Sequence, residues 1–545
     1  MKKYYLLSLS ILLLLFLAGC VKDYFDTDKI STTMQWEPNI AAPLAKANLK
    51  IRDILQDYDH NELFEEDGTG FLYLVYRKKV YSAKAKDIIH LPDQSFPMSY
   101  TKSDVDAVGF NPNHIIKNNI SYPFSVANAQ LLDSIIIKYL EITINVQSSF
   151  HHTGTLIITF PGLVQNGTPF STTIEINDAS GTFSTTASFS DFNNYILDLT
   201  GLTGTDTNKV FINYDLTLYD SGSGTVNNGE SCDITIDLQN LDYHTLFGYL
   251  GQDTLSIDID TVHLEIYDHA FNGTAYFEDP HIYIYINNSY GLPLKMDFDD
   301  FSTFSTIDDS YASFPFPLSI IDIAAPSVNN IGTSELTTIT LDTSNFPQLR
   351  NILDESPKYL FFGVNGYLNP DGYSKNFATD SSHFDVDMEV NLPLWGYASY
   401  LTLEDTTEAD FSENFHDFDD IQWIKFLFNV DNGMPADVFY QVYFDDSTHV
   451  VLDSLFHNEN EMHLVVSGIL DNNYKVVAST HKTTTILYER PRLDLLENTK
   501  YVRFRGYIKT KNIEEAQLVK FYADYTINMK LGVQAQASIN TSEYH

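Results

Sequence analysis

The sequence predicts an all-β protein made of tandem β-sandwiches, and three observations lead to this prediction. Apolar and polar residues alternate over many short segments, for example 255–260 and 282–286. This period of two places alternate side chains on opposite faces of a strand, so that one face can be buried. Turn pairs such as Asn166-Gly167 separate the segments and favour tight hairpins. Helical periodicity is scarce, and many short strands with frequent turns indicate sandwiches.

The predicted strands are rich in Ile, Val, Thr, Tyr and Phe, which suit a pleated and half-buried surface. They cover residues 134–147, 155–160, 170–176, 209–219, 255–260, 262–266, 282–286, 336–342, 358–364, 384–392, 423–430, 437–444, 462–469, 474–479 and 500–509. Short helices fit residues 51–55, 347–355 and 491–497.

Residues 521–539 form an unusually long alternating segment, in which nearly every odd position is apolar. One interpretation is a closing strand of the last sandwich, bent at Gly532. The other is a transmembrane β-strand, which has the same alternation. The acid-rich strands upstream lack the apolar outer face that a membrane sheet needs, so the closing strand is favoured.

The N-terminus predicts an export signal over residues 1–19. A positive start, Met1-Lys2-Lys3, precedes an apolar run that ends in small residues before Cys20. The sequence Leu-Ala-Gly-Cys resembles the lipobox of bacterial lipoproteins. That resemblance implies diacylglycerol on the Cys20 thiol, cleavage before Cys20 and acylation of the new amino terminus, for example with palmitate. Several acyl chains anchor a protein stably, whereas one binds only marginally. The alternative is an uncleaved helix with a chance Cys.

Residues 21–28 follow the lipobox with Val-Lys and then several acids. This stretch resembles the export signal of surface lipoproteins of Bacteroidota. The resemblance implies transfer to the outer leaflet of the outer membrane, facing the cell exterior. The alternative is an ordinary solvated tether.

Length and composition limit the possible organisation and partners. The 545 residues suffice for three or four domains, and 32 Lys+Arg against 73 Asp+Glu give a formal net charge of −41. Such a charge repels phosphate backbones, so nucleic acid is excluded as a partner. Cys232 accompanies only Cys20, so no internal disulfide is expected, and Cys232 is read as a buried strand residue. No apolar run after residue 20 approaches the ~20 residues of a membrane helix.

We expect the following domains: signal peptide 1–19, tether and N-terminal β-module 20–125, and β-sandwiches 126–244, 245–409 and 410–545. Loose motifs at 36–44, 159–163, 279–293 and 430–435 resemble a family of surface-exposed outer-membrane lipoproteins of Bacteroidota without an assigned activity. The Asn-Ser-Tyr-Gly-Leu-Pro turn at 288–293 is also similar to the sandwich domains of late-embryogenesis proteins. These resemblances imply immunoglobulin-like or late-embryogenesis-like sandwiches and a surface address, but no catalytic residues.

Two acidic clusters are candidates for calcium, which takes six to eight oxygen ligands. They comprise Asp297, Asp299 and Asp300, and Asp417, Asp419 and Asp420. Neither has the Asp-x-Asp-x-Asp-Gly loop of an EF-hand, so solvated loops are the competing interpretation. The same acids are the candidates for a glycosidase pair, but sequence cannot show two carboxylates facing each other across a cleft.

Other candidate groups give weaker signals. His151 and His152 are adjacent at a strand end and would face opposite sides, which disfavours a shared metal and favours exposed turn residues. No zinc-protease, nucleophile-elbow or phosphate-loop motif is present in the sequence. Trp395, in a segment with Pro393 and Gly396, is the candidate for stacking on a sugar, with burial in a core or interface as the alternative.

The leading hypothesis is a non-enzymatic surface-exposed outer-membrane lipoprotein. It would act as a scaffold, as an adhesin-like module or as an accessory subunit of an outer-membrane complex, with an outer-membrane barrel or surface complex as partner. The alternative is a glycan-binding lipoprotein of a polysaccharide uptake system. A third hypothesis, a hydrolase, requires a cleft with facing carboxylates. Calcium aside, no cofactor is expected.

Overall fold

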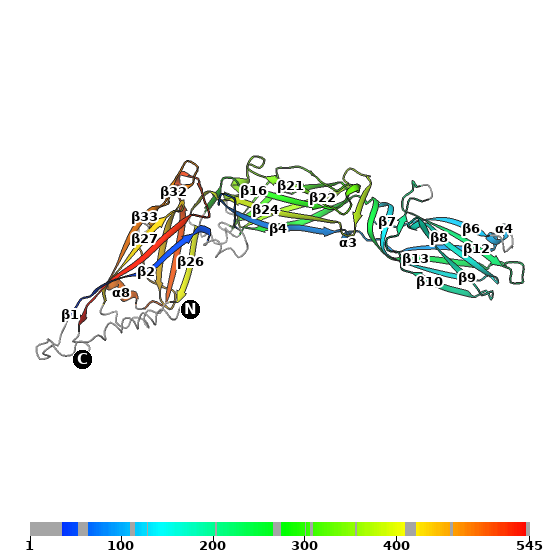
Figure 1. Cartoon of the computed structure of the whole chain (residues 1–545), viewed down its shortest axis with the longest axis horizontal. Helices are drawn as coiled ribbons and strands as arrows, with labels where there is room; N and C mark the ends of the chain where they lie inside the picture. Colours follow the sequence, from blue (N-terminus) through cyan, green and yellow to red (C-terminus); the bar gives the residue numbers. More distant parts are fainter. Residues whose placement is uncertain are drawn as a thin grey trace. The chain divides into compact units, whose positions relative to one another are not determined.

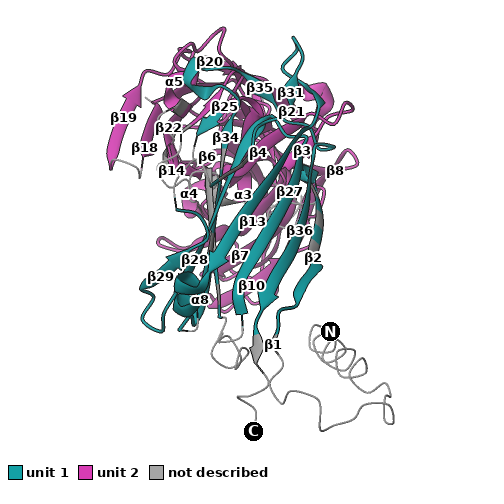
Figure 2. Cartoon of the chain, turned by 90° about the vertical axis from the view of Figure 1, so that its left-hand side faces the viewer, with its two compact units in different colours: residues 1–57, 398–545 teal, residues 58–397 magenta. Residues whose placement is uncertain are grey.

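The computed structural model of the chain describes residues 35–52, 64–108, 115–127, 129–201, 204–264, 274–299, 301–305, 309–354, 357–399, 401–408, 421–457, 462–496 and 498–540 (Figure 1). These residues lie mostly in strands, which confirms the predicted all-β class of tandem sandwiches. The chain forms two compact units, one of residues 1–57 with 398–545 and one of residues 58–397 (Figure 2). In the part of the chain that is described, no helix is both long and apolar enough to cross a membrane. The predicted signal peptide and Cys20 lie outside the described residues.

The second unit, residues 58–397, contains a ten-stranded sheet of order β23-β13-β7-β11-β8-β12-β6, with β10 on β7, β5 on β13 and β9 on β8. Its strands are β5 (Gln94–Thr101), β6 (Ile116–Pro123), β7 (Leu131–Ser148), β8 (Thr153–Gln165), β9 (Thr168–Ile176), β10 (Phe183–Phe189), β11 (Ile196–Asp198), β12 (Lys209–Tyr219), β13 (Ser231–Tyr249) and β23 (Asn376–Thr379). β7 and β13 pair along most of their length, and alternate residues such as Ile144 and Ile236 are fully buried. The short helix α4 (Lys102–Val108) follows β5.

Two further sheets complete this unit. A five-stranded sheet has the order β21-β16-β24-β4-β3, and a six-stranded sheet has the order β19-β18-β22-β17-β20 with β14 on β22. Their strands are β3 (Phe64–Glu66), β4 (Leu72–Lys84), β14 (Asp253–His263), β16 (His281–Asn288), β17 (Leu294–Phe298), β18 (Phe301–Ser305), β19 (Ser310–Phe314), β20 (Ile321–Ile323), β21 (Glu335–Leu341), β22 (Tyr359–Leu368) and β24 (His383–Pro393). Ile284 on β16 and Phe362 on β22 belong to the buried faces, and the residues beside them point outward.

The remaining elements of residues 58–397 are short: α3 (Ala85–Ile88), β15 (Thr274–Phe277), η3 (Val328–Asn330) and α5 (Leu349–Asp354). β25 (Trp395–Ser399) contains the boundary between the units. Helix α5 lies within the helix predicted at 347–355.

The first unit contains a four-stranded sheet, β2-β36-β27-β33, and a five-stranded sheet, β26-β34-β28-β29 with β30 on β28. Its elements are β1 (Gln35–Trp36), β2 (Asn39–Lys50), β26 (Leu401–Glu408), β27 (Ile421–Asn432), β28 (Ala436–Asp445), β29 (Val451–Ser454), β30 (His463–Val465), β31 (Ile469–Leu470), β32 (Val476–Ala478), β33 (Thr480–Glu489), α8 (Arg490–Leu496), β34 (Tyr501–Thr510), η5 (Ile513–Glu515), β35 (Val519–Lys520), β36 (Thr526–Ala537) and β37 (Ile539–Asn540). Helix α8 lies within the helix predicted at 491–497. A core around Tyr488, Leu493 and Phe456 packs α8 against the strands.

Strand β36 covers residues 526–537 of the long strand predicted over 521–539, and residues 523–524 form a turn before it. It pairs antiparallel with β2 on one side and with β27 on the other. The register irregularity with β2 falls between Pro43 and Ala45, opposite Gly532, so the partner strand carries the bulge. A strand that is paired on both edges has its backbone groups satisfied within the sheet.

The expected N-terminal module at 20–125 differs from what the structure shows. β2 pairs with β36, β4 with β24, β5 with β13 and β6 with β12. These strands therefore join four different partners instead of forming a module of their own. Pairing between strands that are far apart in sequence leaves no local pattern, because alternation shows which face is buried but not which strand lies alongside.

Candidate binding site

Four aromatic rings lie side by side across four neighbouring strands of the six-stranded sheet. Tyr311 on β19 is in register with Phe304 on β18, and Phe304 is in register with Tyr359 on β22. Tyr359 is in turn in register with His263 on β14. We call these four residues the aromatic row. These side chains are neighbours because register partners on adjacent strands stand directly opposite each other on one face of the sheet.

The rings of the aromatic row are in contact distance of one another. Their centroids lie 4.6 Å apart for Phe304 and Tyr311, 6.4 Å for Phe304 and Tyr359, and 5.1 Å for His263 and Tyr359. The planes of these pairs differ by 40°, 20° and 28°. Phe361, two residues along β22, adds a ring 6.2 Å from Tyr359 and 6.3 Å from Tyr311. The rings therefore form one continuous strip of aromatic surface.

The aromatic row faces outward. The exposed fraction of Tyr311 is 73%, and Phe304, Tyr359, Phe361 and His263 are each partly exposed. Their neighbours along the strands are buried instead, among them Thr303, Leu360 and Phe362. Contiguous exposed apolar surface is uncommon on soluble proteins and marks sites of interaction. The aromatic row is thus a candidate binding surface.

Hydroxyl groups flank the aromatic row. Ser313 on β19 is in register with Ser302 on β18, Ser302 with Phe361, and Phe361 with Thr261 on β14. We call Ser313, Ser302 and Thr261 the hydroxyl row. A hydroxyl both donates and accepts a hydrogen bond, so this row offers either function to a ligand lying on the rings.

Positive charge also lies beside the aromatic row. Lys358 places its Nζ 5.7 Å from the centre of the Tyr359 ring, within the range of a cation–π contact. A second ammonium group, that of Lys78, donates a hydrogen bond of 2.7 Å to the carbonyl oxygen of Thr261. The surroundings of the rings thus combine an aromatic surface, hydroxyls and the ammonium groups of Lys358 and Lys78.

A shallow pocket of about 340 Å³ lies on the five-stranded sheet and offers different chemistry. It is lined by Arg77, Lys78, Lys79, Tyr285, Asp387, Met388 and Glu389. The guanidinium of Arg77 lies 2.6 Å from Glu65 and 2.8 Å from Glu389, and Lys79 lies 3.2 Å from Asp385. The hydrogen bond to Glu65 raises the pKa of Arg77 further. Because these ionic groups already pair with one another, the pocket is a weaker candidate than the aromatic row.

Trp395, the aromatic residue singled out from the sequence, is half-buried at the start of β25 and is not part of the aromatic row. Its carbonyl oxygen accepts a hydrogen bond of 2.8 Å from the amide of Glu278. Next to it, the ring of Tyr397 stacks on that of Tyr276 at 4.6 Å. Trp395 is thus held in a strand rather than presented on a loop.

The acidic clusters are only partly described. Asp297 belongs to β17, and Asp299 accepts a 3.4 Å hydrogen bond from Asn365. Asp300, Asp417, Asp419 and Asp420 lie outside the described residues. Among the residues that the structure does describe, no group of three or more His, Cys, Asp or Glu side chains is placed to hold a metal ion.

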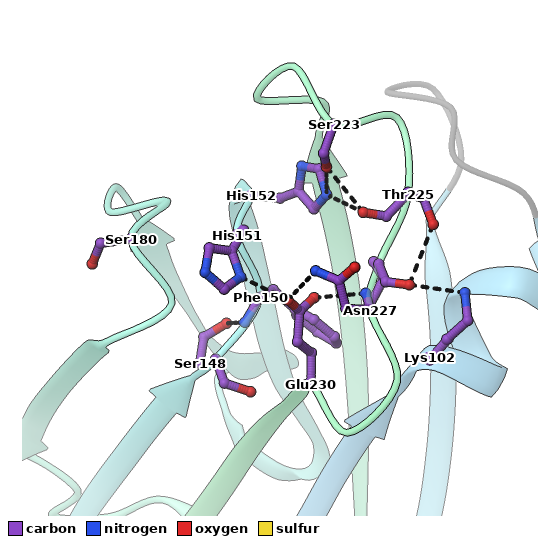
Figure 3. Close-up of polar contacts among 12 residues, drawn as sticks. Lys102, Ser148, Phe150, His151, His152, Ser180, Ser223, Thr225, Asn227 and Glu230 are labelled. Carbon is purple, nitrogen blue, oxygen red and sulfur yellow. Dashed lines mark hydrogen bonds and ion pairs between the residues drawn. The ribbon is translucent and has the colours of Figure 1, made fainter.

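His152 lies in a constellation that looks catalytic at first sight (Figure 3). Ser223 Oγ is 3.1 Å from His152 Nε2, and Asp220 Oδ1 is 3.9 Å from Nδ1. However, Nδ1 accepts a hydrogen bond from the amide of Ser221 (3.1 Å), and Nε2 lies 3.0 Å from the carbonyl oxygen of Thr225. The proton must therefore be on Nε2, because a carbonyl can only accept. A general base would need a free lone pair on that nitrogen, so His152 fastens the 220–230 loop.

The same loop is fastened by neighbouring residues (Figure 3). His151 Nδ1 lies 2.6 Å from Glu230, and Lys102 donates to the carbonyl oxygen of Val226 at 2.8 Å. Burial raises the pKa of Glu230, but hydrogen bonds from Asn227 and His151 outweigh it and lower the pKa overall. Of the two histidines expected as exposed turn residues, His151 is exposed and His152 is fully buried. The expectation fails for His152 because the distant 220–230 loop covers it.

Cys232 is fully buried on β13, as predicted, and is not paired in a disulfide. Burial raises the pKa of its thiol to about 12. The thiolate, which is the reactive form of cysteine, therefore does not form near neutral pH.

Sequence reasoning missed the aromatic row because its members lie on four strands between residues 263 and 359. One signal was available: in the predicted strand 358–364, Tyr359 and Phe361 share one face while Leu360 and Phe362 share the other. A strand that is apolar on both faces is either fully buried or displays a binding surface.

Comparisons with known proteins assign no family. No family model matches the chain, and no curated protein matches it. Among solved structures, a protein of Parabacteroides distasonis whose secretion is inferred matches with 14% identity and a TM-score of 0.28, covering 51% of this chain and 82% of its own. A structure of infectious bursal disease virus, strain Gt, matches with 9% identity and a TM-score of 0.14, covering 84% of this chain and 82% of its own. Scores this low support no inference about this chain.

Proposed function

We propose that the chain is a non-enzymatic, surface-exposed outer-membrane lipoprotein that serves as an adhesin-like binding module, within a scaffold or as an accessory subunit of an outer-membrane complex. The observation that carries the binding role is the aromatic row of Tyr311, Phe304, Tyr359 and His263. The membrane address rests on the lipobox that ends at Cys20 and on the acidic stretch after it.

The sheet faces of this chain support a binding role for the aromatic row. Asp385 and Asp387 on β24 are partly exposed carboxylates, as expected for a face that water reaches. The corresponding positions on β18 and β22 carry Phe304, Tyr359 and Phe361 instead. Leaving these rings in water forgoes the hydrophobic stabilisation that their burial would supply, so a ligand or partner that covers them gains it.

The groups that could suggest catalysis are already engaged elsewhere. His152 holds backbone atoms of the 220–230 loop, and Glu230 holds Asn227 and His151. These contacts support a binding protein over a hydrolase, since each group would have to leave its partners before it could act on a substrate.

The address is tested by radiolabelled palmitate and by fractionation of a Cys20→Ala variant. We expect the label to enter the native protein only, and the variant to leave the membrane fraction. Protease added to intact cells should degrade the native protein. The binding role is tested by adhesion of these cells to host or polysaccharide-coated surfaces, with Tyr311→Ala as the variant. An unlabelled, protease-resistant protein would contradict the proposed address.

A second candidate, favoured by the hydroxyl row beside the rings, is a glycan-binding lipoprotein of a polysaccharide uptake system. Growth of a deletion strain on polysaccharides as the carbon source separates it from the first. Slow growth on one polysaccharide, with normal growth on its monosaccharide, supports uptake, and normal growth on both supports adhesion.

A further inference from the structure

We infer that the outer face of the four-stranded sheet β2-β36-β27-β33 lies against anionic headgroups of the membrane that holds the lipid anchor. This inference rests on the anchor of the proposed function and names a second contact of the protein, separate from the aromatic row. It follows from a pair of lysines without a countercharge, from the charge of the face around them and from the short chain between this sheet and Cys20.

One face of this sheet points away from the core of the first unit. The opposite face carries Ile486, which belongs to that core, and Phe426, which packs against it. Residues that alternate with these point outward, and on β33 they are exposed. We call the outward positions of the four strands the lysine face. They include Lys46 and Lys50 on β2, Lys530 on β36 and Lys425 on β27.

Two of these lysines stand directly opposite each other. Lys46 and Lys530 are register partners, and both are exposed. Like charges in such positions destabilise a strand pair. Neither lysine forms an ion pair with an acidic side chain of the described residues. The next pair on the same face, Asn48 and Asn528, is neutral and joined by a hydrogen bond of 2.7 Å. An anion between the two ammonium groups therefore relieves a repulsion that the protein itself leaves in place.

The lysine face is basic, although the chain as a whole is acidic. It carries four lysines and two acids, Asp431 and Glu489, and Asp431 lies 2.8 Å from His481 Nδ1. Over the whole chain, 73 Asp+Glu outnumber 32 Lys+Arg. A negatively charged membrane repels such a chain but attracts a basic face that comes within about one Debye length. Charge therefore turns the lysine face of the anchored protein toward the membrane.

The chain between the anchor and the sheet is short. β2 begins at Asn39, and an extended chain spans at most ~3.3–3.6 Å per residue, so β2 starts within about 70 Å of Cys20. Once the anchor has inserted, the headgroups are present at a high effective concentration, whereas an acidic protein in solution has to arrive by diffusion. The membrane is therefore the source of anionic groups that this face meets first.

The test uses the full-length lipoprotein in vesicles of phosphatidylcholine alone or of an equal mixture with anionic phosphatidylglycerol. A membrane-impermeant acetylating reagent labels exposed lysines, and mass spectrometry reads each lysine separately. We expect Lys46, Lys50 and Lys530 to react at least about fivefold more slowly on the mixed vesicles, because each lysine near an anionic surface shifts the equilibrium about fivefold. In about 1 M salt, where the Debye length is about 3 Å, this difference should vanish.

Lys46→Gln combined with Lys530→Gln removes both charges of the opposed pair, and Lys50 reports the result. The docking equilibrium should weaken about fivefold for each lysine removed, so Lys50 should lose its protection on the mixed vesicles. Both altered side chains are exposed, and their mutual repulsion is removed, so the unfolding midpoint should not fall.

The matched control is Lys117→Gln combined with Lys375→Gln. These lysines of residues 58–397 are 62% and 76% exposed, but each lies near an acid, Asp215 at 3.8 Å and Asp133 at 3.1 Å. The control removes the same charge from the chain without touching the lysine face. Protection of Lys50 on the mixed vesicles should therefore remain as in the native protein.

The outcomes separate this inference from the proposed function. If the protein joins both kinds of vesicle but Lys46 and Lys530 react at equal rates on each, the inference is wrong and the anchor stands. The same holds if Lys50 stays protected in the Lys46→Gln, Lys530→Gln variant. Protection by added polyglutamate on phosphatidylcholine vesicles, without protection on the mixed vesicles, would assign the face to an acidic protein and also overturn the inference. A protein that joins neither kind of vesicle refutes both the anchor and this contact.

Discussion

Removing the arginine of a buried ion pair should destabilise the first unit strongly. Asp445, at the end of β28, is 1% exposed, and its Oδ2 lies 3.0 Å from Nε of Arg503 on β34. Its Oδ1 is buried and makes no hydrogen bond among the described residues. Arg503→Met would leave a buried carboxylate without its countercharge, which costs about 3–5 kcal/mol. Loss of the contact between Arg503 and the Tyr443 ring, now 4.3 Å from its centre, adds about 0.5–1 kcal/mol.

Two further variants control this prediction. Arg490→Met removes the same side chain from an exposed pair, in which Arg490 lies 3.6 Å from Asp494 and the two side chains are 36% and 64% exposed. It should cost less than about 1 kcal/mol, the usual value of a surface ion pair. Asp445→Asn in the Arg503→Met background removes the stranded charge and should recover part of the loss.

Hydrogen exchange read by mass spectrometry measures the opening free energy of peptides from β28 and β34, and urea unfolding gives the midpoint. The reasoning is wrong if Arg503→Met costs no more than Arg490→Met. It is also wrong if Asp445→Asn fails to stabilise the Arg503→Met protein.

Three further predictions concern the loops and the thiol. His152→Ala should destabilise the 220–230 loop by about 1–3 kcal/mol, seen as faster hydrogen exchange there, because two partly buried hydrogen bonds to the loop backbone are lost; labelling of Ser223 by a fluorophosphonate would contradict this structural role. Cys232 should resist iodoacetamide at pH 8 until urea unfolds the protein, as a mass shift would report. Hydrogen bonds from Thr448 and Val450 lower the pKa of Asp446 below its ordinary 3.8. Near this pKa the unfolded chain then binds more protons than the folded chain. The stability that Asp446 contributes is therefore present above pH 3.8 and is lost as the pH falls through the lowered pKa of the folded state. Thr448→Val should flatten the acid dependence of the urea midpoint, and an unchanged dependence would refute the assignment.

Local sequence pattern predicts many elements from residue 134 onward, but it does not predict β2, β4, β5 or β6. The alternation at 282–286 predicts β16, which extends from His281 to Asn288, and the segment 358–364 predicts β22, Tyr359–Leu368. The short helices α5 and α8 also lie where helices were predicted. These elements are predictable because residues two positions apart along a strand share one face, so a buried face appears in the local sequence as alternation.

Partners and sites are far less predictable, for a physical reason. β2 pairs with β36 through partners such as Asn48 and Asn528, nearly the whole chain apart. The alternation of one strand is compatible with any other alternating strand as its partner. The local pattern therefore does not identify the partner. The aromatic row has the same origin, since its four members meet only through three such pairings. Its residue types are visible in the sequence, whereas their alignment is a property of register.

The aromatic row differs from the other partly exposed rings of this chain in how its members are brought together. On β24, the partly exposed Asp385 and Asp387 are acidic, and the neighbouring strand β16 carries the stacked, partly exposed rings of His281, Tyr283 and Tyr285. The rings on β16 follow one another along a single strand, which the alternation of that strand alone explains. Instead, Tyr311, Phe304 and Tyr359 occupy consecutive register positions across three strands, with serines at the next outward positions on β19 and β18. A line of three rings on neighbouring strands requires those strands to agree in register, and the position after the ring is a serine on β19 and β18 but Phe361 on β22.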